Sequence, residues 1–564
     1  MLLPSYILLI LVQLCASNPV TNDGLVGADN LVFTNAQQSI EGNFNGNLLL
    51  INGQIHTMSA NDDVVSVVAI KYGKIVYLGG SQTDAEQALQ GTHPRLIDLH
   101  GRVAIPGLID CHNHIVLMGN RPGHHTPLEN AYSIADVQDT YMQRAAGVPP
   151  GEFITTIGGF HPNQFRETRL PTLAELDEAA PDNPVFISIG FFGPATTNSL
   201  GKKFFESLAP DPVVVAANGT ITVFLENNKA LLALRQRLTF SERERGVRDA
   251  MAYATSLGVT THLDQGAFQA TGSPLIDGSA HENNYAMHLP FLSVYDDGEG
   301  TVRLRINFLH MDESADVPAL TQRLMNAFRF FGNDMVRTGA IGEFIAANYS
   351  GGPVFEEAGR RIARAGWRAE VHSLTETDYQ TEIQGFEVVD AEVGIKDLRW
   401  VVAHVPFITE EYLARLKKLM GGVNLSAFQY LAGTGPNSGP PYRMVVDSGI
   451  PAGIGGDGMQ IAMMNPWVQI YYATTGKSAL GEQINEGQQI SRLEALHLYT
   501  RANQWFLGGP DEKLLGALEV GRLGDIVVLS DDYFSVADDQ LRNLTSVLTV
   551  VGGVVVHHSA VLGQ

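Results

Sequence analysis

The sequence predicts an α/β protein: a distorted (β/α)8 TIM-type barrel with a small β-sandwich formed by both chain ends and an inserted subdomain. In the middle of the chain, strand-like runs such as "VRLRINFLH" and "LRWVVAHVP" alternate with helix-like stretches such as "ITEEYLARLKKLMG". This alternation is typical of βα units around a parallel sheet. Both chain ends instead carry β-branched runs broken by glycine turns, as in "VVSVVAIKYGKIVYLGG" and "LTSVLTVVGGVVVHHSA".

The chain begins with a segment typical of a secretory signal. Residues 1–17 are apolar and end in small residues, and they are too short to span a bilayer as a mature helix. An N-terminal membrane anchor is the alternative interpretation. We expect a secreted glycoprotein with no stable membrane anchor after signal removal, because four Asn-x-Ser/Thr sequons follow: Asn218, Asn348, Asn424 and Asn543.

Turn signals and composition divide the rest of the chain. Residues 18–45 are polar without a period and form an N-terminal arm. Residues 46–105 form the first part of the β-sandwich, in which Asn52-Gly53 indicates a hairpin. The barrel takes residues 106–514, with a less regular insertion at about 125–235, and residues 515–564 complete the sandwich.

The charge indicates which kinds of ligand the chain binds, and the cysteine content indicates whether it has a disulfide. The 564 residues carry a net charge of −23 without a Lys/Arg cluster, so we expect a small-molecule substrate and no nucleic acid. A homodimer is compatible with the sequence. Of the two cysteines, Cys15 lies in the signal, so the mature chain has no intramolecular disulfide. We interpret Cys111 as a small buried apolar residue.

Polar residues stand where apolar strands of the barrel stop. In "GLIDCHNHIVLMG", His112 and His114 are two residues apart, so in a strand they share a face and could bind one metal ion. Taken alone, they could equally be buried, hydrogen-bonded histidines. His372, His404 and Asp457 end three further strand-like runs. Catalytic groups of such barrels lie at these strand ends, so a metal centre is the better interpretation of the whole set.

These residues resemble the pattern of the metal-dependent amidohydrolase superfamily, in particular amidohydrolase family 3, the N-substituted formamide deformylase-like branch. The resemblance includes "GRVAIPGLIDCHNH", "LPTLAELDEAAPDNPVFI" and "LGALEVGRLGDIVVLSDDY". It implies that His112, His114, His372 and His404 are metal ligands. It also implies that Asp457 binds the metal or its water and moves protons. The implied cofactor is Zn2+, as one or two ions, although another divalent metal could serve.

Two departures from the family pattern concern the metal count and the substrate. Many members supply a carboxylated lysine on the fourth strand, whereas "MVRTGAIGEF" has Arg337 there and no lysine. Glu343 could bridge two ions instead, or it could be a solvated or ion-paired loop residue. The run "HSLTET" after the His372 strand lacks the common Gly-Asp, so no substrate contact is transferred to that loop.

Other polar residues are weaker candidates. We predict that His161 and Tyr430 contact substrate, with a structural role as the alternative for each. The remaining pairs are interpreted as a strand histidine with its partner (His262, Asp264), a solvated loop (His124, His125) and part of the β-rich domain (His557, His558).

The resulting hypothesis is a secreted metal-dependent hydrolase that cleaves a non-peptide C–N bond, in an amide or cyclic amide, by metal-activated water. The same scaffold could instead serve an esterase or lactonase, because a metal site alone does not distinguish an amine from an alkoxide leaving group. A catalytically idle secreted binding protein is the third alternative. The intact set of four histidines and Asp457 argues against it.

Overall fold

The computed structural model describes residues 46–190, 193–267, 286–347, 350–432, 438–458 and 462–562. The predicted signal, the N-terminal arm and the sequon at Asn348 lie outside these residues. Within them, no helix is both long and apolar enough to cross a membrane.

Eight parallel strands form the centre of the molecule, as two four-stranded sheets with the orders β16-β15-β14-β8 and β17-β18-β19-β20. Their bounds are β8 Leu108–Asn113, β14 Val259–Asp264, β15 Arg303–Phe308, β16 Val336–Ile341, β17 Glu370–Ser373, β18 Val401–His404, β19 Gly422–Leu425 and β20 Ala452–Ile454. One parallel bridge, Ile341 to Ala369, joins the sheets at one side. Beyond β20, the Asp457 amide donates to the His112 carbonyl at 2.8 Å. Full closure of the barrel stays a prediction.

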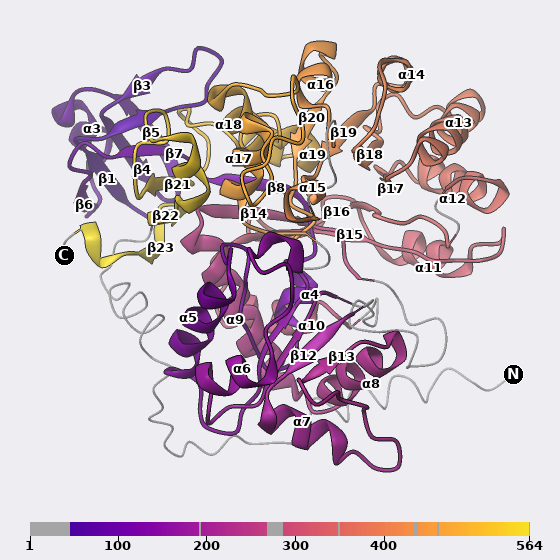
Figure 1. Cartoon of the computed structure of the whole chain (residues 1–564). Coiled ribbons are helices and arrows are strands. Elements are labelled where there is room, and N and C mark those ends of the chain that lie inside the picture. Colours follow the sequence, from indigo (N-terminus) through magenta and orange to yellow (C-terminus); the bar gives the residue numbers. More distant parts are fainter. Residues whose placement is uncertain are drawn as a thin grey trace, which may run out of the picture.

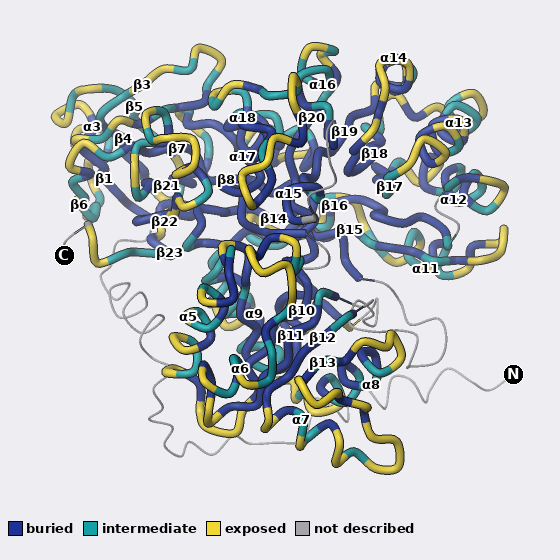
Figure 2. Tube along the Cα trace, in the orientation of Figure 1, coloured by how far each residue is buried: buried dark blue, intermediate teal, exposed yellow. Residues whose placement is uncertain are grey.

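Helices follow most of these strands and cover the sheets (Figure 1). They include α4 Ile115–Gly119, α9 Phe240–Ser256, α10 Leu289–Asp296, α11 Pro318–Asn326, α12 Pro353–Arg364, α13 Glu376–Glu392, α14 Glu410–Lys418, α15 Phe428–Ala432, α16 Tyr442–Ser448, α17 Pro466–Thr475, α18 Arg492–Tyr499 and α19 Gln504–Leu507. Capping boxes fix several starts: Thr239 caps α9 and Thr375 caps α13, each with an acidic partner three residues on. Figure 2 shows that the central strands are buried.

Both chain ends contribute to a β-rich unit, at the upper left of Figure 1. One sheet has the order β5-β4-β1-β6 and the other the order β23-β22-β21-β7-β2-β3. The strands are β1 Leu48–Ile51, β2 Gln54–His56, β3 Val64–Val65, β4 Val67–Lys71, β5 Lys74–Gly79, β6 Arg95–Asp98, β7 Val103–Pro106, β21 Ile526–Leu529, β22 Ser546–Val551 and β23 Val554–His558. Because β21 pairs with β7, the two ends share one sheet. Leu50, Val68 and Val528 belong to one hydrophobic cluster that both sheets supply.

Between β8 and β14 the chain forms a separate unit, below the central strands in Figure 1. Its sheet has the order β13-β12-β11-β10-β9. The elements are β9 His124–His125, β10 Ile154–Ile157, β11 Val185–Ser188, β12 Ala195–Thr197, β13 Thr220–Ile221, α5 Ile134–Ala145, α6 Leu173–Ala179, α7 Ser199–Glu206 and α8 Phe224–Arg235. The prediction of a solvated loop at His124 and His125 is wrong. Both are buried in the edge strand, and Glu152 lies 2.6 Å from His124 Nε2.

Candidate metal centre

Four buried side chains converge where the central strands end: His112, Glu343, His404 and Asp457. One potential ligand atom from each lies within 4.8 Å of the others. His112 and His404 end β8 and β18, whereas Glu343 and Asp457 follow β16 and β20. Carboxyl ends of parallel strands meet at one edge, so residues distant in sequence are brought to one place.

The two other predicted ligands adjoin this group. His114 Nε2 lies 3.2 Å from Glu343 Oε2 and 3.0 Å from Asp457 Oδ1. His372 Nδ1 contacts Glu343 Oε1, and its ring centroid is 4.6 Å from that of His404. All six residues predicted as ligands are therefore gathered at one site.

The site contains buried polar atoms that the protein itself does not satisfy. Among the described residues, His112 Nε2, His114 Nε2 and Asp457 Oδ1 make no hydrogen bond of good geometry, although Asp457 Oδ1 lies 3.0 Å from His114 Nε2 and 3.5 Å from His112 Nε2. Buried polar atoms are nearly always bonded, so three such atoms facing one another indicate a missing ligand. Imidazole nitrogens and carboxylate oxygens are the ligand types that zinc takes. The donor set fits a divalent cation.

Charges within the site support the same conclusion. Burial alone lowers the pKa of His112, but the nearby carboxylates of Asp457 and Glu370 outweigh it and raise this pKa to about 10. Burial likewise raises the pKa of Glu343, but His372, His114 and His404 hold it well below its ordinary value. The Glu343 carboxylate therefore stays ionised, and the His112 imidazole stays protonated in the metal-free site. A bound cation would replace this proton.

Glu370, which the sequence analysis missed, orients the first predicted ligand. Its Oε1 lies 2.5 Å from His112 Nδ1, and its Oε2 accepts from Arg368 at 2.6 Å. A carboxylate on the far nitrogen of a metal-binding histidine fixes the tautomer and ring orientation. The available signal was its position two residues before His372, because alternate residues of a strand share a face.

Asp110 and a glycine join the ends of β8 and β20. Asp110 Oδ1 accepts from the backbone amides of His112 and Gly456, each at 3.1 Å. A Cβ at Gly455 would lie 2.5 Å from the His112 nitrogen, so only glycine permits this approach. Buried Cys111 accepts from Asn424 and contacts the Ile454 carbonyl, as expected of a packing residue.

Arg337, at the position where a lysine was considered, lies in a separate ion-pair cluster. It pairs with Asp511 and with Asp334, and Arg305 also binds Asp511 at 2.6 Å. The fourth-strand acidic group of the site is Glu343, which is 3% exposed. The solvated form of its alternative interpretation is therefore wrong. The ion-paired form agrees with its contacts to His114, His372 and His404, so metal binding by Glu343 stays a prediction.

The predicted substrate contacts have structural partners. His161 Nδ1 accepts from the Asn163 amide and caps the short helix η1, Pro162–Gln164. Tyr430 is fully buried and its hydroxyl lies 2.9 Å from that of Tyr132. Each residue fits the structural alternative, and substrate contact by either stays a prediction.

Three other interpretations of the sequence, for His262 with Asp264, for the sequons and for His557 with His558, have different outcomes. The Asp264 carboxylate lies 2.7 Å from His288 Nε2 rather than bonding to His262, whose ring nitrogens have no hydrogen-bond partner among the described residues. The sequons at Asn218 and Asn543 are exposed. Glycosylation of Asn424 is contradicted, since this side chain is fully buried in β19 and bonds to Cys111. His557 and His558 lie in β23 of the β-rich unit, as expected.

Comparisons with known proteins identify the family of this chain. The sequence model of the amidohydrolase family matches residues 95–557. N-substituted formamide deformylase of Arthrobacter pascens is 23% identical over 566 residues, covering 90% of this chain and 97% of that protein. Putative amidohydrolase YtcJ of Bacillus subtilis (strain 168) is 23% identical and covers 90% of this chain and 99% of its own.

Solved structures share the fold at low identity. An uncharacterized metal-dependent hydrolase from Pyrococcus horikoshii OT3 has a TM-score of 0.59 and 17% identity, covering 87% of this chain and 99% of that one. Atrazine chlorohydrolase TrzN from Arthrobacter aurescens TC1, complexed with zinc, has a TM-score of 0.54 and 17% identity, covering 91% of this chain and 95% of that one.

Proposed function

As a member of the amidohydrolase family, this chain is a metal-dependent hydrolase acting on C–N bonds, and we propose that its substrate is a small non-peptide amide or cyclic amide. The amide class is supported by the similarity to N-substituted formamide deformylase. The metal on which the reaction depends is supported by the convergence of His112 Nε2, His114 Nε2 and Asp457 Oδ1, which make no hydrogen bond of good geometry among the described residues. A metal at this place, when bound, lowers the pKa of a water molecule to about 7 and polarises a carbonyl. Zinc suits the donor set best.

Asp457 is the proton carrier of the proposed reaction. Burial raises its pKa, but the neighbouring histidines outweigh this and hold the pKa well below its ordinary value, so its carboxylate is ionised. Its Oδ1 accepts a proton from the attacking water as the C–O bond forms. The same oxygen returns the proton to the nitrogen as the C–N bond breaks, which releases an amine and a carboxylic acid.

Glu343 can serve one ion or two. Its Oε1 faces His404 at 3.1 Å and contacts His372, while its Oε2 faces His114 at 3.2 Å. A carboxylate with histidines on both oxygens can bridge two cations. The metal content of purified protein gives the number.

Activity and metal content together test the proposal. Protein purified without added metal is assayed for bound zinc and for hydrolysis of an amide panel, with matching esters and lactones. We expect His112→Ala to lose zinc and activity, and Asp457→Asn to lose activity. His557→Ala, in the β-rich unit, is the matched histidine control. Unchanged turnover in both site variants would contradict the assignment. Preference for esters would assign the esterase alternative, and bound zinc without any turnover the idle binding protein.

We also propose that the chain is secreted after removal of residues 1–17 and carries glycans at Asn218 and Asn543. The exposure of both asparagines supports this proposal. The mature N-terminus and the glycan sites are measured by mass spectrometry of protein from the culture medium.

A further inference from the structure

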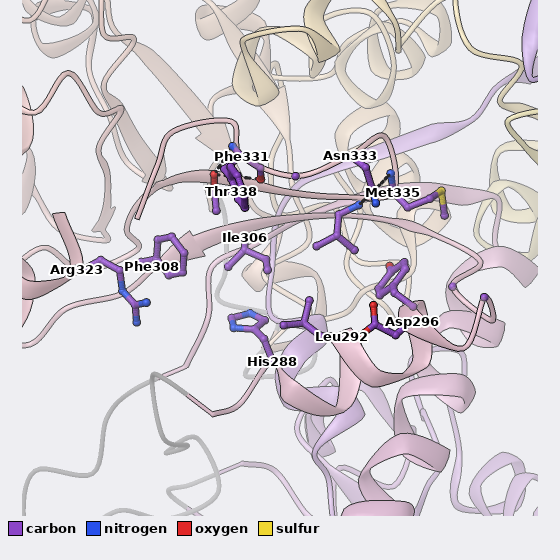
Figure 3. Close-up of a pocket in the computed structure, with 15 residues that line it drawn as sticks. His288, Leu292, Asp296, Ile306, Phe308, Arg323, Phe331, Asn333, Met335 and Thr338 are labelled. Carbon is purple, nitrogen blue, oxygen red and sulfur yellow. Dashed lines mark hydrogen bonds between the residues drawn. The ribbon is translucent and has the colours of Figure 1, made fainter. Parts of the chain in front are cut away.

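A cavity of about 570 Å³ lies beside β15 and β16, and none of its lining residues belongs to the metal centre. Figure 3 shows its walls: the two strands, the helix that carries Leu292 and Asp296, and the connection around Phe331 and Asn333.

The cavity lies where the connection between α11 and β16 leaves part of the strand surface uncovered. Arg305 and Arg337 point from β15 and β16 to Asp511, so the alternate residues of both strands face the other way, into the cavity. In a barrel of βα units, a helix normally covers this outer face. Here α11 ends at Asn326, and residues 327–335 reach β16 without a helix. The strand surface is left partly uncovered.

The exposed lining is mainly apolar. Leu292, Ile306, Phe308, Met335 and Val336 form the walls. Sites for small molecules have volumes of about 300–1,000 Å³ and mostly apolar linings, so this cavity has the size and chemistry of such a site. The hollow is partly open to solvent, and walls from three structural elements give it a depth that suits a small molecule better than a protein segment.

A chain of contacts leads from the cavity to the metal centre. His288 lines the cavity, and its Nε2 lies 2.7 Å from Asp264 Oδ2. The same Asp264 oxygen accepts from the Gly266 amide at 3.2 Å. The Gly266 carbonyl lies 2.7 Å from His114 Nδ1. A change at His288 can therefore alter the orientation of His114, through one carboxylate and the two peptide groups on either side of the Gly266 Cα.

We propose that this cavity is an accessory site for a small uncharged aromatic or alkyl compound, and that its occupation changes metal affinity through His288, Asp264 and Gly266. The binding stands by itself, whereas the effect on the metal rests on the proposed function of His114.

Binding is tested on the full chain with indole and benzyl alcohol as probes, and benzoate as a charged counterpart, by calorimetry. We expect the uncharged probes to bind. Benzoate should bind more weakly, because burying its charge costs free energy that the Arg323 guanidinium, over the Phe308 ring of the lining, offsets only in part. Leu292→Trp fills the cavity and should abolish binding. Leu289→Trp, on the same helix but outside the lining, is the matched control because both leucines are partly exposed, at 38% and 49%.

Absence of binding to the unaltered chain, or equal loss in both tryptophan variants, would overturn the proposal. A second copy of the chain could instead cover this face by packing on the exposed Phe328 and Phe331. Analytical ultracentrifugation tests this alternative by measuring the oligomeric state. A dimer that dissociates on Phe331→Asp, in a chain that binds neither probe, would assign this face to self-association and also overturn it.

The effect on the metal is measured as the zinc dissociation constant with and without saturating indole. We expect a change of about fivefold or more, as is usual for coupled sites, and its loss in His288→Leu. Indole binding with unchanged zinc affinity would overturn the coupling. A chain that binds indole but no zinc would instead contradict the proposed function and leave the cavity site standing.

Discussion

Replacing Glu370 with glutamine tests whether His112 is a metal ligand whose ring is oriented by a carboxylate at its Nδ1. The substitution keeps an oxygen 2.5 Å from His112 Nδ1 but removes the charge that raises the basicity of this imidazole. Loss of such an outer partner typically lowers metal affinity about 10- to 100-fold. That corresponds to about 1.4–2.8 kcal/mol of binding free energy.

The control is a second buried glutamate near the same strand. Glu382 contacts Ser373 but belongs to no predicted ligand set, and burial raises its pKa well above the ordinary value. Glutamine therefore mimics its protonated form. Zinc affinity of Glu370→Gln, Glu382→Gln and the unaltered chain is compared by competition with a chromogenic chelator. Affinity in Glu370→Gln equal to that of the control would refute the reasoning, provided that both variants unfold cooperatively.

The remaining predictions concern chemistry, pH and stability. In zinc-saturated protein, Asp457→Asn should lower kcat about 10²- to 10⁴-fold, the range for loss of a proton-transfer group, as measured by steady-state kinetics. Because the metal-free pKa of His112 is raised to about 10 from the ordinary 6.5, protons compete with zinc. Zinc affinity should therefore rise with pH up to about 10, and competition with a chelator measures this rise. The stabilisation that protonated His112 gives the metal-free chain is complete below pH 6.5 and lost toward pH 10, so its urea midpoint should fall across that window. Asp511→Asn should cost about 3–5 kcal/mol in urea unfolding, because Arg305 and Arg337 lose their buried partner. The matched Asp334→Asn, which removes an exposed carboxylate from its pair with Arg337, should cost less than about 1 kcal/mol.

Residues at strand ends could be predicted because the signal is local. An apolar run that stops at a histidine or aspartate marks both the strand and the edge where its side chain lies, as for His404 and Asp457. The β-rich character of both chain ends could be predicted in the same way, although the pairing of β21 with β7 comes from the structure alone.

Contacts between segments could not be read in this way. Glu370 bonds to His112 only because β17 and β8 bring their ends to one site, and Asp264 bonds to His288 only because α10 lies beside β14. The environment of the His124-His125 pair could not be predicted for the same reason, because its partners come from other segments. His124 looked like a solvated loop residue, yet Glu152 and Arg245 satisfy its ring nitrogens inside the fold.

The metal centre explains why so many ionisable groups lie in one buried place. Glu343 and Asp457 follow β16 and β20, Glu370 begins β17, and all three are buried, where isolated carboxylates are costly. Arg368 offsets one charge, and imidazole protons offset the others only in part, because Asp457 Oδ1 and two histidine nitrogens stay without hydrogen bonds of good geometry among the described residues. A structural ion-pair network would satisfy these atoms, as the arginines around Asp511 satisfy theirs. The contrast within one molecule separates a set of charges that balance each other from a set whose hydrogen bonding is incomplete and whose donor atoms fit a cation.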